Sequence, residues 1–302
     1  MPINLTILGS GSAVPVLERG VTSQYLNINE RRILIDCGEG TQLQLRKFRV
    51  KFQRLQFIFI SHLHGDHFLG IFGLISSMSL LGRTNKLIIF GPKALEDIVR
   101  HQFKLTEVYL SFELEFRTLD CSEKELVFED KSIEIYAFPL KHRVQCHGFL
   151  FKEKLRDLRI NKPKIQEYNL SLVEILAAKR GNDIERDSTV ILNTEITLPP
   201  EKPLSYAFCT DTKYIEKLPA WIKGANLLYH EATFASEHIE KAKKTGHSTT
   251  TQAATIAKNA GVDKLLLGHF SSRYTETTEL LEEAKQVFKN VVCVEDGDVF
   301  LV

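Results

Sequence analysis

Short apolar runs of β-forming residues alternate along this 302-residue chain with stretches whose apolar positions recur at helical spacing. Such alternation is typical of layered α/β domains. Five of the strand-like runs have a His or an Asp within two residues of their C-terminal end. These runs are residues 56–60, 133–140, 205–209, 227–229 and 265–267, and the residues that follow them are His62, His142, Asp211, His230 and His269. Because the ends of neighbouring strands lie along one edge of a sheet, we expect these side chains to converge.

The pattern changes between residues 152 and 198, where charge is scattered and apolar residues follow no sustained period. Pro163 and the run Gly181-Asn182-Asp183 interrupt this segment, and a single helical stretch is expected near residues 170–179. We therefore predict one domain over residues 1–302, with residues 152–198 forming an inserted flexible arm and not a second folded domain.

The densest group of potential metal ligands is His62-Leu63-His64-Gly65-Asp66-His67, between the run at residues 56–60 and a helix-like apolar run at residues 68–81. His62 and His64 are two apart on an extended segment and so project to the same side. Gly65 permits a sharp turn that brings Asp66 and His67 beside them. Four ligands within six residues are more than one zinc ion needs from a local cluster, so the pattern indicates two metal ions.

Two catalytic ions need six or more protein contacts, and the strand-end residues complete the set. We predict a first site of His62, His64 and His142, a second of Asp66, His67 and His269, and Asp211 as a bridge. Two ions about 4 Å apart lower the pKa of a shared water and bind both the attacking and the leaving oxygen of a phosphoryl displacement. A phosphate-binding P-loop is excluded, because Gly9-Ser10-Gly11-Ser12 lacks the required lysine.

Composition limits the location and the partners of the chain. No apolar run approaches the roughly 20 residues that span a bilayer, and residues 1–20 lack the pattern of a secretion signal, so we expect a cytoplasmic protein without a membrane segment. The five cysteines form no C-x-x-C pair, which argues against a zinc ribbon or a disulfide framework. Net charge is only +1, but basic residues gather at 46–54 and 152–164, either as solvated faces or as phosphate contacts.

The ligand motif resembles that of the metallo-β-lactamase superfamily, which is H-x-H-x-D-H after a strand. Further segments are similar to the ribonuclease Z family of tRNA 3′-processing endonucleases, over residues 3–150 and 204–275. These segments are Leu34-Ile35-Asp36-Cys37-Gly38-Glu39-Gly40-Thr41-Gln42, residues 61–77, His230-Glu231-Ala232-Thr233-Phe234, Gly246-His247-Ser248-Thr249 and His269-Phe270-Ser271-Ser272-Arg273-Tyr274.

This resemblance implies an αββα four-layer sandwich, the metallo-β-lactamase fold, with an inserted substrate-binding arm. It implies an endoribonuclease with two Zn²⁺ per subunit that cleaves precursor tRNA at its 3′ side through a metal-bridging hydroxide. The tRNA would keep a 3′-hydroxyl and the trailer a 5′-phosphate. Asp66 would also accept the proton of the attacking water, and His247 would be the general acid. A homodimer is implied as well, because in the family the arm of one subunit reaches the tRNA that the other cleaves.

The chain departs from the family at two places. Residues 169–176 lack the Gly-Pro motif of the family's arm, and Val16-Leu17-Glu18-Arg19 stands where relatives have a basic loop. Other histidines are expected to have no ligand role: His101, His238 and His147 are excluded, and His230 is expected to support a ligand without binding metal. Glu231 would orient a neighbouring histidine, and Arg273 either touches the scissile phosphate or is a solvated surface residue.

Two other functions remain open from the residues. The first is a metallo-hydrolase of small phosphodiesters or lactones, which would not need residues 152–164. The second is a non-catalytic RNA-binding relative, which the complete ligand set and His247 disfavour. The same ligands accept zinc or manganese, so the sequence leaves the metal in the cell open.

Overall fold

The computed structural model describes residues 3–186 and 189–302 and divides the chain into two compact units. Unit 1 contains Met1–Glu129, Ile133–Lys152 and Leu204–Val302, and unit 2 contains Asp130–Ser132 and Glu153–Pro203. Residues 153–198 of the segment expected as an arm therefore lie in unit 2.

The first sheet of unit 1 has seven strands and is antiparallel at one end and parallel at the other. In spatial order its strands are β18 (Val299–Leu301), β1 (Asn4–Gly9), β2 (Ser23–Ile28), β3 (Arg31–Ile35), β4 (Phe57–Phe59), β5 (Leu87–Gly91) and β6 (Leu114–Thr118). Strands β3 to β6 pair in parallel. The continuous apolar sequence of β4 fits this position, because a parallel strand is covered on both faces.

The second sheet also has seven strands, and its parallel part includes three of the strands that were expected to have a His or an Asp near their ends. Its order is β17 (Val291–Cys293), β16 (Lys264–Gly268), β15 (Leu227–Glu231), β14 (Ser205–Cys209), β9 (Cys146–Glu153), β8 (Ile133–Leu140) and β7 (Glu125–Glu129). Strands β14 to β17 are parallel neighbours, so their C-terminal ends lie at one edge.

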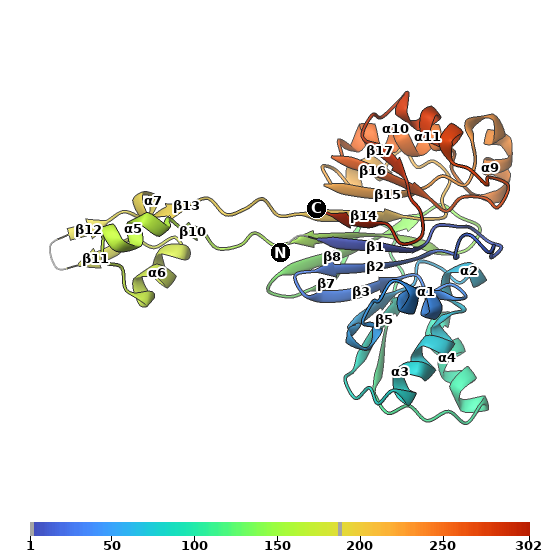
Figure 1. Cartoon of the computed structure of the whole chain (residues 1–302), viewed down its shortest axis with the longest axis horizontal. Helices are drawn as coiled ribbons and strands as arrows, with labels where there is room; N and C mark the ends of the chain where they lie inside the picture. Colours follow the sequence, from blue (N-terminus) through green and yellow to red (C-terminus); the bar gives the residue numbers. More distant parts are fainter. Residues whose placement is uncertain (1–2, 187–188) are drawn as a thin grey trace. The chain divides into compact units, whose positions relative to one another are not determined.

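Helices cover the outer face of each sheet, which gives unit 1 four layers (Figure 1). On the first sheet lie α1 (Thr41–Lys47), α3 (Ile71–Leu80) and α4 (Ala94–Leu105); on the second lie α8 (Leu218–Trp221), α10 (Thr250–Ala260) and α11 (Thr278–Lys285). Shorter helices are η1 (Phe52–Arg54), α2 (Gly65–Phe68), η2 (Ser236–His238) and α9 (Ile239–Thr245). The predicted αββα architecture is confirmed.

The core between the two sheets is strongly aromatic. Phe59 stacks on Phe90 with ring centroids 4.3 Å apart, and it meets Phe149 edge-on at 5.2 Å. These rings are almost fully buried, and each such side chain contributes about 1.5–3 kcal/mol relative to an exposed one. The dense packing fixes the two sheets against each other and so fixes the positions of their strand ends.

Unit 2 has its own small apolar cluster, formed by Leu170, Ala178, Ile184, Ile191 and Ile196. Its elements are β10 (Arg159–Ile160) paired with β13 (Thr197–Leu198), β11 (Ile184–Arg186) paired with β12 (Thr189–Ile191), and the helices α5 (Lys162–Glu167), α6 (Leu172–Lys179) and α7 (Asn193–Ile196). The expected helix near residues 170–179 is α6, which begins after a capping box of Ser171 and Glu174. The expectation of a single helical stretch was wrong, because α5 and α7 are too short to show a period in sequence.

Two local expectations around the histidine motif need correction. Gly65 makes no sharp turn but is the first residue of α2, and the turn of this helix brings Asp66 and His67 round. The helix expected at residues 68–81 is α3, which begins only at Ile71. Gly70 separates the two helices where a Cβ atom would collide with the carbonyl oxygen of Gly38. Among the described residues, no helix has the length and apolar character that crossing a bilayer requires.

Candidate metal centre

Four segments deliver His or Asp side chains of the candidate centre to the same edge of the sandwich. His62 follows β4, His142 follows β8, Asp211 follows β14 and His269 follows β16, as the strand-end pattern predicted. His230 differs, because it lies within β15 opposite Cys209 of β14. The neighbouring side chains form three groups with metal-ligand character, and the third, Asp211, His247 and His269, shares Asp211 and His269 with the two clusters described next.

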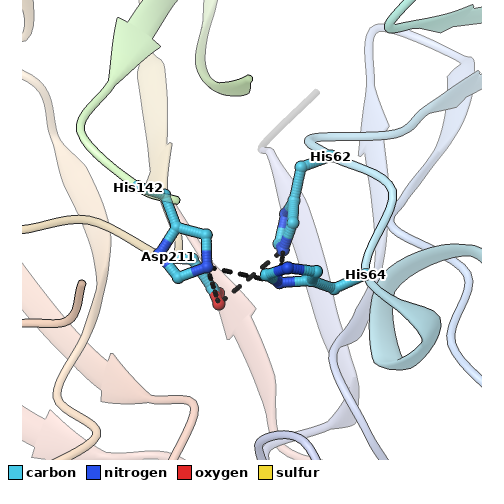
Figure 2. A group of neighbouring side chains, drawn as sticks. All are labelled: His62, His64, His142 and Asp211. Carbon is cyan, nitrogen blue, oxygen red and sulfur yellow. Dashed lines mark hydrogen bonds and ion pairs between the residues drawn. The ribbon is translucent and has the colours of Figure 1, made fainter. Parts of the chain in front are cut away.

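The first cluster consists of His62, His64, His142 and Asp211, whose ligand atoms lie within 4.8 Å of one another. Figure 2 shows the three imidazoles and the carboxylate directed at a common point. His64 Nδ1 lies 3.0 Å from His62 Nε2 and 3.2 Å from His142 Nε2. Asp211 Oδ2 lies 3.7 Å from His62 Nε2 and 3.6 Å from His142 Nε2. Three nitrogens and one oxygen so arranged are a donor set that suits a tetrahedral cation.

The second cluster consists of Asp66, His67 and His269 and lies beside the first. Asp211 Oδ1 is 3.2 Å from His67 Nε2 and 3.0 Å from His269 Nε2. Asp66 Oδ2 lies 3.3 Å from His67 Nε2. Asp211 therefore directs one oxygen to each cluster, which is the geometry that a bridging carboxylate requires.

Hydrogen bonds fix the orientation of four of these imidazoles through the nitrogen that faces away from the clusters. His62 Nδ1 pairs with Ser61 Oγ at 3.0 Å, and His142 Nδ1 with the Gly246 carbonyl at 2.8 Å. His67 Nδ1 pairs with Asp36 Oδ2 at 2.7 Å, and His269 Nδ1 with Thr233 Oγ1 at 2.9 Å. Metal-binding histidines are usually held in this way, with the second nitrogen left for the ion.

Two buried nitrogens provide the strongest test of whether a cation fits. His67 Nε2 and His269 Nε2 are buried and form no hydrogen bond with any residue that the structure describes. Leaving such a group unpaired costs about 1–3 kcal/mol. Both atoms face carboxylate oxygens of Asp66 and Asp211. A divalent cation among these atoms would satisfy all of them, so the residues present fit a metal.

The charges of the centre are also those of a cation site. Burial lowers the pKa of both His62 and His142, which favours the neutral imidazole that binds metals. Burial raises the pKa of the Asp66 carboxyl, but His67 and His269 outweigh it and hold that pKa well below its usual range. For Asp211 the neighbouring histidines likewise overcome burial and lower the pKa. Ionised carboxylates beside the neutral imidazoles of His62 and His142 attract a divalent ion.

Asp36 has a role that the sequence analysis missed. It is fully buried, accepts hydrogen bonds from Ser61 N at 2.8 Å and Ser61 Oγ at 2.9 Å, and binds His67 Nδ1. One carboxylate thus positions both the start of the histidine motif and a ligand within it. The signal was present, because Asp36 directly follows β3 and the strand-end pattern applied to that strand would have selected it.

Glu231 connects the ends of three segments around His247. Its Oε1 accepts hydrogen bonds from Thr212 N at 3.0 Å and Ser248 N at 3.1 Å, and lies 3.0 Å from His247 Nδ1. Its Oε2 accepts from Thr233 Oγ1 at 2.7 Å, the hydroxyl that also pairs with His269. Burial disfavours the charged form of His247, but the Glu231 carboxylate outweighs it and raises the pKa of the imidazole to about 9.

Three residues with a strained backbone lie around the two clusters. Ala13, Asp36 and His269 have φ values of 53°, 57° and 59°, in the left-handed region that costs residues with a side chain of order 1–3 kcal/mol. Such conformations persist only where surrounding contacts hold them. The centre therefore depends on its supporting hydrogen bonds as well as on its ligand atoms.

The remaining candidates lie outside both clusters. His230 donates from Nδ1 to the Glu231 carbonyl at 2.7 Å and belongs to no ligand group among the described residues. His147 is buried beside Ser61, and His238 lies at the surface 3.5 Å from Glu237. Arg273 lies over the Phe234 ring at 5.1 Å. His101 lies on the exposed side of α4.

The fold and the paired His and Asp clusters define a candidate metal centre on a metallo-β-lactamase fold. Residues 3–177 match a family model described as "Anti-Pycsar protein Apyc1". The metallo-β-lactamase fold protein YhfI from Bacillus subtilis superposes with a TM-score of 0.71, covering 100% of both chains at 20% identity. The family model ends before β14 to β16, which carry Asp211, Glu231 and His269, so it covers only part of the centre.

Full-length relatives identify the family. The chain is 43% identical over 294 residues to the ribonuclease Z of Bacteroides fragilis, covering 97% of each chain. The short form of human tRNase Z superposes with a TM-score of 0.70 at 28% identity, covering 98% of each chain. The chain belongs to the ribonuclease Z family. The resemblance expected from the sequence motifs is thereby confirmed.

Proposed function

We propose that this protein is a zinc-dependent endoribonuclease that removes the 3′ trailer from precursor tRNA. The tRNA keeps a 3′-hydroxyl, and the trailer carries a 5′-phosphate. One observation supports this most directly: seven His and Asp side chains converge as two clusters joined by Asp211, in a chain 43% identical to a ribonuclease Z.

Two Zn²⁺ ions per subunit fit these clusters. His62, His64 and His142 would hold the first ion, Asp66, His67 and His269 the second, and Asp211 both. Imidazole nitrogens together with carboxylate oxygens suit zinc. When bound, the two ions would lower the pKa of a water molecule towards neutrality and stabilise the negative charge of the reacting phosphodiester.

The residues of the chain then move two protons. A water oxygen attacks the phosphorus and becomes part of the 5′-phosphate of the trailer, while Asp66 accepts a proton from that water. The bond from phosphorus to the 3′ oxygen of the tRNA breaks, and His247 donates a proton to this oxygen. Because His247 Nδ1 is held by Glu231, its Nε2 is the atom left to carry the transferred proton.

Unit 2 has a surface suited to the phosphate backbone of the RNA. Arg156, Arg159, Lys162 and Lys179 line an open cavity of about 760 Å³, together with Asp157 and Glu201 as the only acids of the lining. Basic side chains at such a cavity would neutralise phosphates with little dependence on base sequence. We assign substrate binding to this part of the predicted arm, with the exposed basic residues 46–54 of unit 1 as a second contact.

We further propose a cytoplasmic homodimer. Helices α1 and α3 pack together through Gln42 and Ser77, and next to this contact they expose Leu43 and Leu80. Leu80 is 87% exposed, and a second copy of the chain would cover it. A dimer would also let the arm of one subunit bind the tRNA that the other subunit cleaves.

The decisive experiment is incubation of the zinc-loaded protein with a tRNA precursor that carries a 3′ trailer, followed by end-group analysis of both products. We expect a single cut, a 3′-hydroxyl on the tRNA and a 5′-phosphate on the trailer. Asp66→Ala should reduce the rate at least a thousandfold, because it loses a metal ligand and a proton acceptor, while precursor binding changes less than threefold. Wild-type cleavage by Asp66→Ala would contradict the assignment.

A small phosphodiester separates this proposal from the alternative of a small-molecule hydrolase. Deletion of residues 155–195 should weaken precursor binding but leave turnover of bis(p-nitrophenyl) phosphate within about threefold of wild type. If the full chain turns over the small ester and leaves the precursor intact, the alternative function is correct.

A further inference from the structure

Asp296 lies in the turn between β17 and β18, at the C-terminal end of the chain, and binds a loop from the N-terminal end. Its Oδ1 accepts hydrogen bonds from Ser10 N at 2.9 Å and Ser10 Oγ at 2.8 Å. Its Oδ2 accepts from Gly20 N at 2.6 Å and from Gln44 Nε2 at 2.7 Å. Bonds to an ionised acceptor are about twice as strong as neutral ones. One carboxylate therefore closes both ends of the loop formed by residues 10–20.

This loop contacts Asp66 of the second cluster and the residue that follows His269. The backbone N–H of Ala13 donates to Asp66 Oδ2 at 2.7 Å. The carbonyl of Ser10 accepts from Phe270 N at 3.0 Å, and Ser12 N donates to the Phe270 carbonyl at 3.1 Å. Phe270 directly follows His269, so the loop fixes the backbone on which this histidine stands.

The loop also maintains two strained residues. Ala13 and His269 are both left-handed, with φ of 53° and 59°, and neither is a glycine. Gly20 packs so closely that a Cβ atom there would lie 2.7 Å from Gln44 Nε2 and 3.3 Å from Asp296 Oδ2. Tight packing against the carboxylate is what holds the loop, and through it both strained residues, in place.

The imidazoles of the first cluster are held by other groups. His62 is oriented by Ser61, and His142 by the carbonyl of Gly246, and neither of these bonds involves residues 10–20 or Asp296. If residues 10–20 lost their conformation, the second cluster would consequently be disturbed more than the first.

We infer that Asp296 is a positioning residue for the second metal site, acting through residues 10–20 on Asp66 and His269. The inference rests on the proposed two-metal function. It adds that the Asp296 carboxylate sets the affinity of the second site for its ion independently of the first site. The side chain itself touches neither cluster, so its effect on the metal is indirect.

The test is a zinc titration of the purified full-length protein in competition with a chromophoric chelator, comparing Asp296→Asn with wild type. The amide nitrogen of asparagine accepts no hydrogen bond. Asp296→Asn therefore leaves up to two of the four groups that donate to Asp296 without an acceptor, at nearly constant side-chain volume. We expect the weaker ion to bind about tenfold less tightly and the tighter ion to keep its affinity, as found when groups behind metal ligands are changed. Asp66→Ala identifies which of the two ions belongs to the second cluster.

Asp298→Asn is the matched control. Asp298 lies in the same turn, and its carboxylate accepts from Glu295 N at 2.9 Å without contacting residues 10–20. Both zinc affinities should be unchanged in this variant. Ser10→Ala is a milder second variant that removes one donor to Asp296, and it should weaken the second ion by a smaller factor if Asp296→Asn fails to fold.

The outcomes separate the inference from the function on which it rests. If wild type binds two zinc ions, and Asp296→Asn and Ser10→Ala bind both with unchanged affinity, the inference is wrong while the metal assignment stands. Equal weakening of both ions would also overturn it, because that result indicates general destabilisation. If wild type binds fewer than two ions, the proposed function itself fails.

Discussion

Single carboxylates decide the geometry of this centre at the scale of residues. Asp36 and Glu231 are both fully buried, and each accepts a hydrogen bond from at least one backbone N–H as well as from an imidazole. A buried charge is tolerated when it is paired and its lone pairs are filled. The same hydrogen bonds select the tautomer of His67 and His247 and so determine which nitrogen faces the reacting groups.

Asp36→Asn tests this dependence. The amide would present a donor to His67 Nδ1 or lose an acceptor for Ser61, so His67 would be less well oriented. We expect zinc affinity to fall about 10–100-fold, measured by competition with a chelator. Asp120→Asn, at an exposed carboxylate that pairs with Gln145, should leave the affinity unchanged. Unaltered zinc binding in Asp36→Asn would show that the metal centre does not depend on Asp36.

Strand ends and short helices determine the site at the scale of elements. The parallel run β14 to β16 places Asp211, Glu231 and His269 side by side, because the parallel register pairs Cys209 with His230 and Glu231 with Gly268. Helix α2 supplies Asp66 and His67 from one turn. The small elements of unit 2 enclose a separate cluster of five apolar residues and carry the basic cavity at their surface.

Replacing Lys162 and Lys179 by alanine tests the basic cavity. If each contacts a phosphate, precursor affinity should fall, and the slope of log affinity against log salt should decrease by about one for each lysine. The dissociation constant would be measured between about 50 and 200 mM salt. A matched pair, Lys223→Ala with Lys258→Ala in unit 1, should leave the slope unchanged. An equal slope in both double variants would contradict a role for the cavity.

At the scale of the whole molecule, folding is coupled to metal binding. Asp36, Asp66, Asp211 and Glu231 bring four acidic groups to one largely buried region, where burial disfavours their charged forms unless cations compensate it. A ligand that binds only the folded state stabilises it by mass action, by about 2.7 kcal/mol at a hundredfold excess over Kd.

Metal removal should therefore lower the thermal stability. We expect chelation to reduce Tm by several degrees, since 1 kcal/mol corresponds to about 2–4 °C for domains of 150–250 residues. Differential scanning calorimetry with and without added zinc measures the shift. His64→Ala should show a smaller shift than wild type, because the first cluster loses a ligand. A Tm that does not depend on zinc would show that the clusters hold no ion.

Introducing negative charge at two exposed leucines tests the proposed homodimer. Leu43→Asp with Leu80→Asp should convert a particle of twice the 34.4 kDa chain mass into a monomer in sedimentation equilibrium, because burying the two carboxylates would disfavour association. Leu301→Asp, at an exposed position of β18, is the control and should leave the dimer intact. A wild-type protein that sediments as a monomer would refute the proposal.

The sequence by itself determined the features that depend on local geometry. Short apolar runs alternating with helical spacing indicated the α/β layers, and the fixed projection of side chains on a strand placed His62 and His64 on one side. The strand-end pattern selected His142, Asp211 and His269, because the ends of neighbouring strands lie along one edge of a sheet. The short pieces of unit 2 escaped detection, since two- to six-residue elements carry no sustained periodic signal.

Only the tertiary structure decided which distant groups bond to one another. Asp36 meets His67 across 31 residues of sequence, Glu231 meets His247 across 16, and Asp296 meets Ser10 across 286. Sheet order and register set these partners, and no local spacing encodes them. The left-handed conformations of Ala13 and His269 have the same origin, because contacts from elsewhere in the chain must stabilise a backbone that the local sequence disfavours.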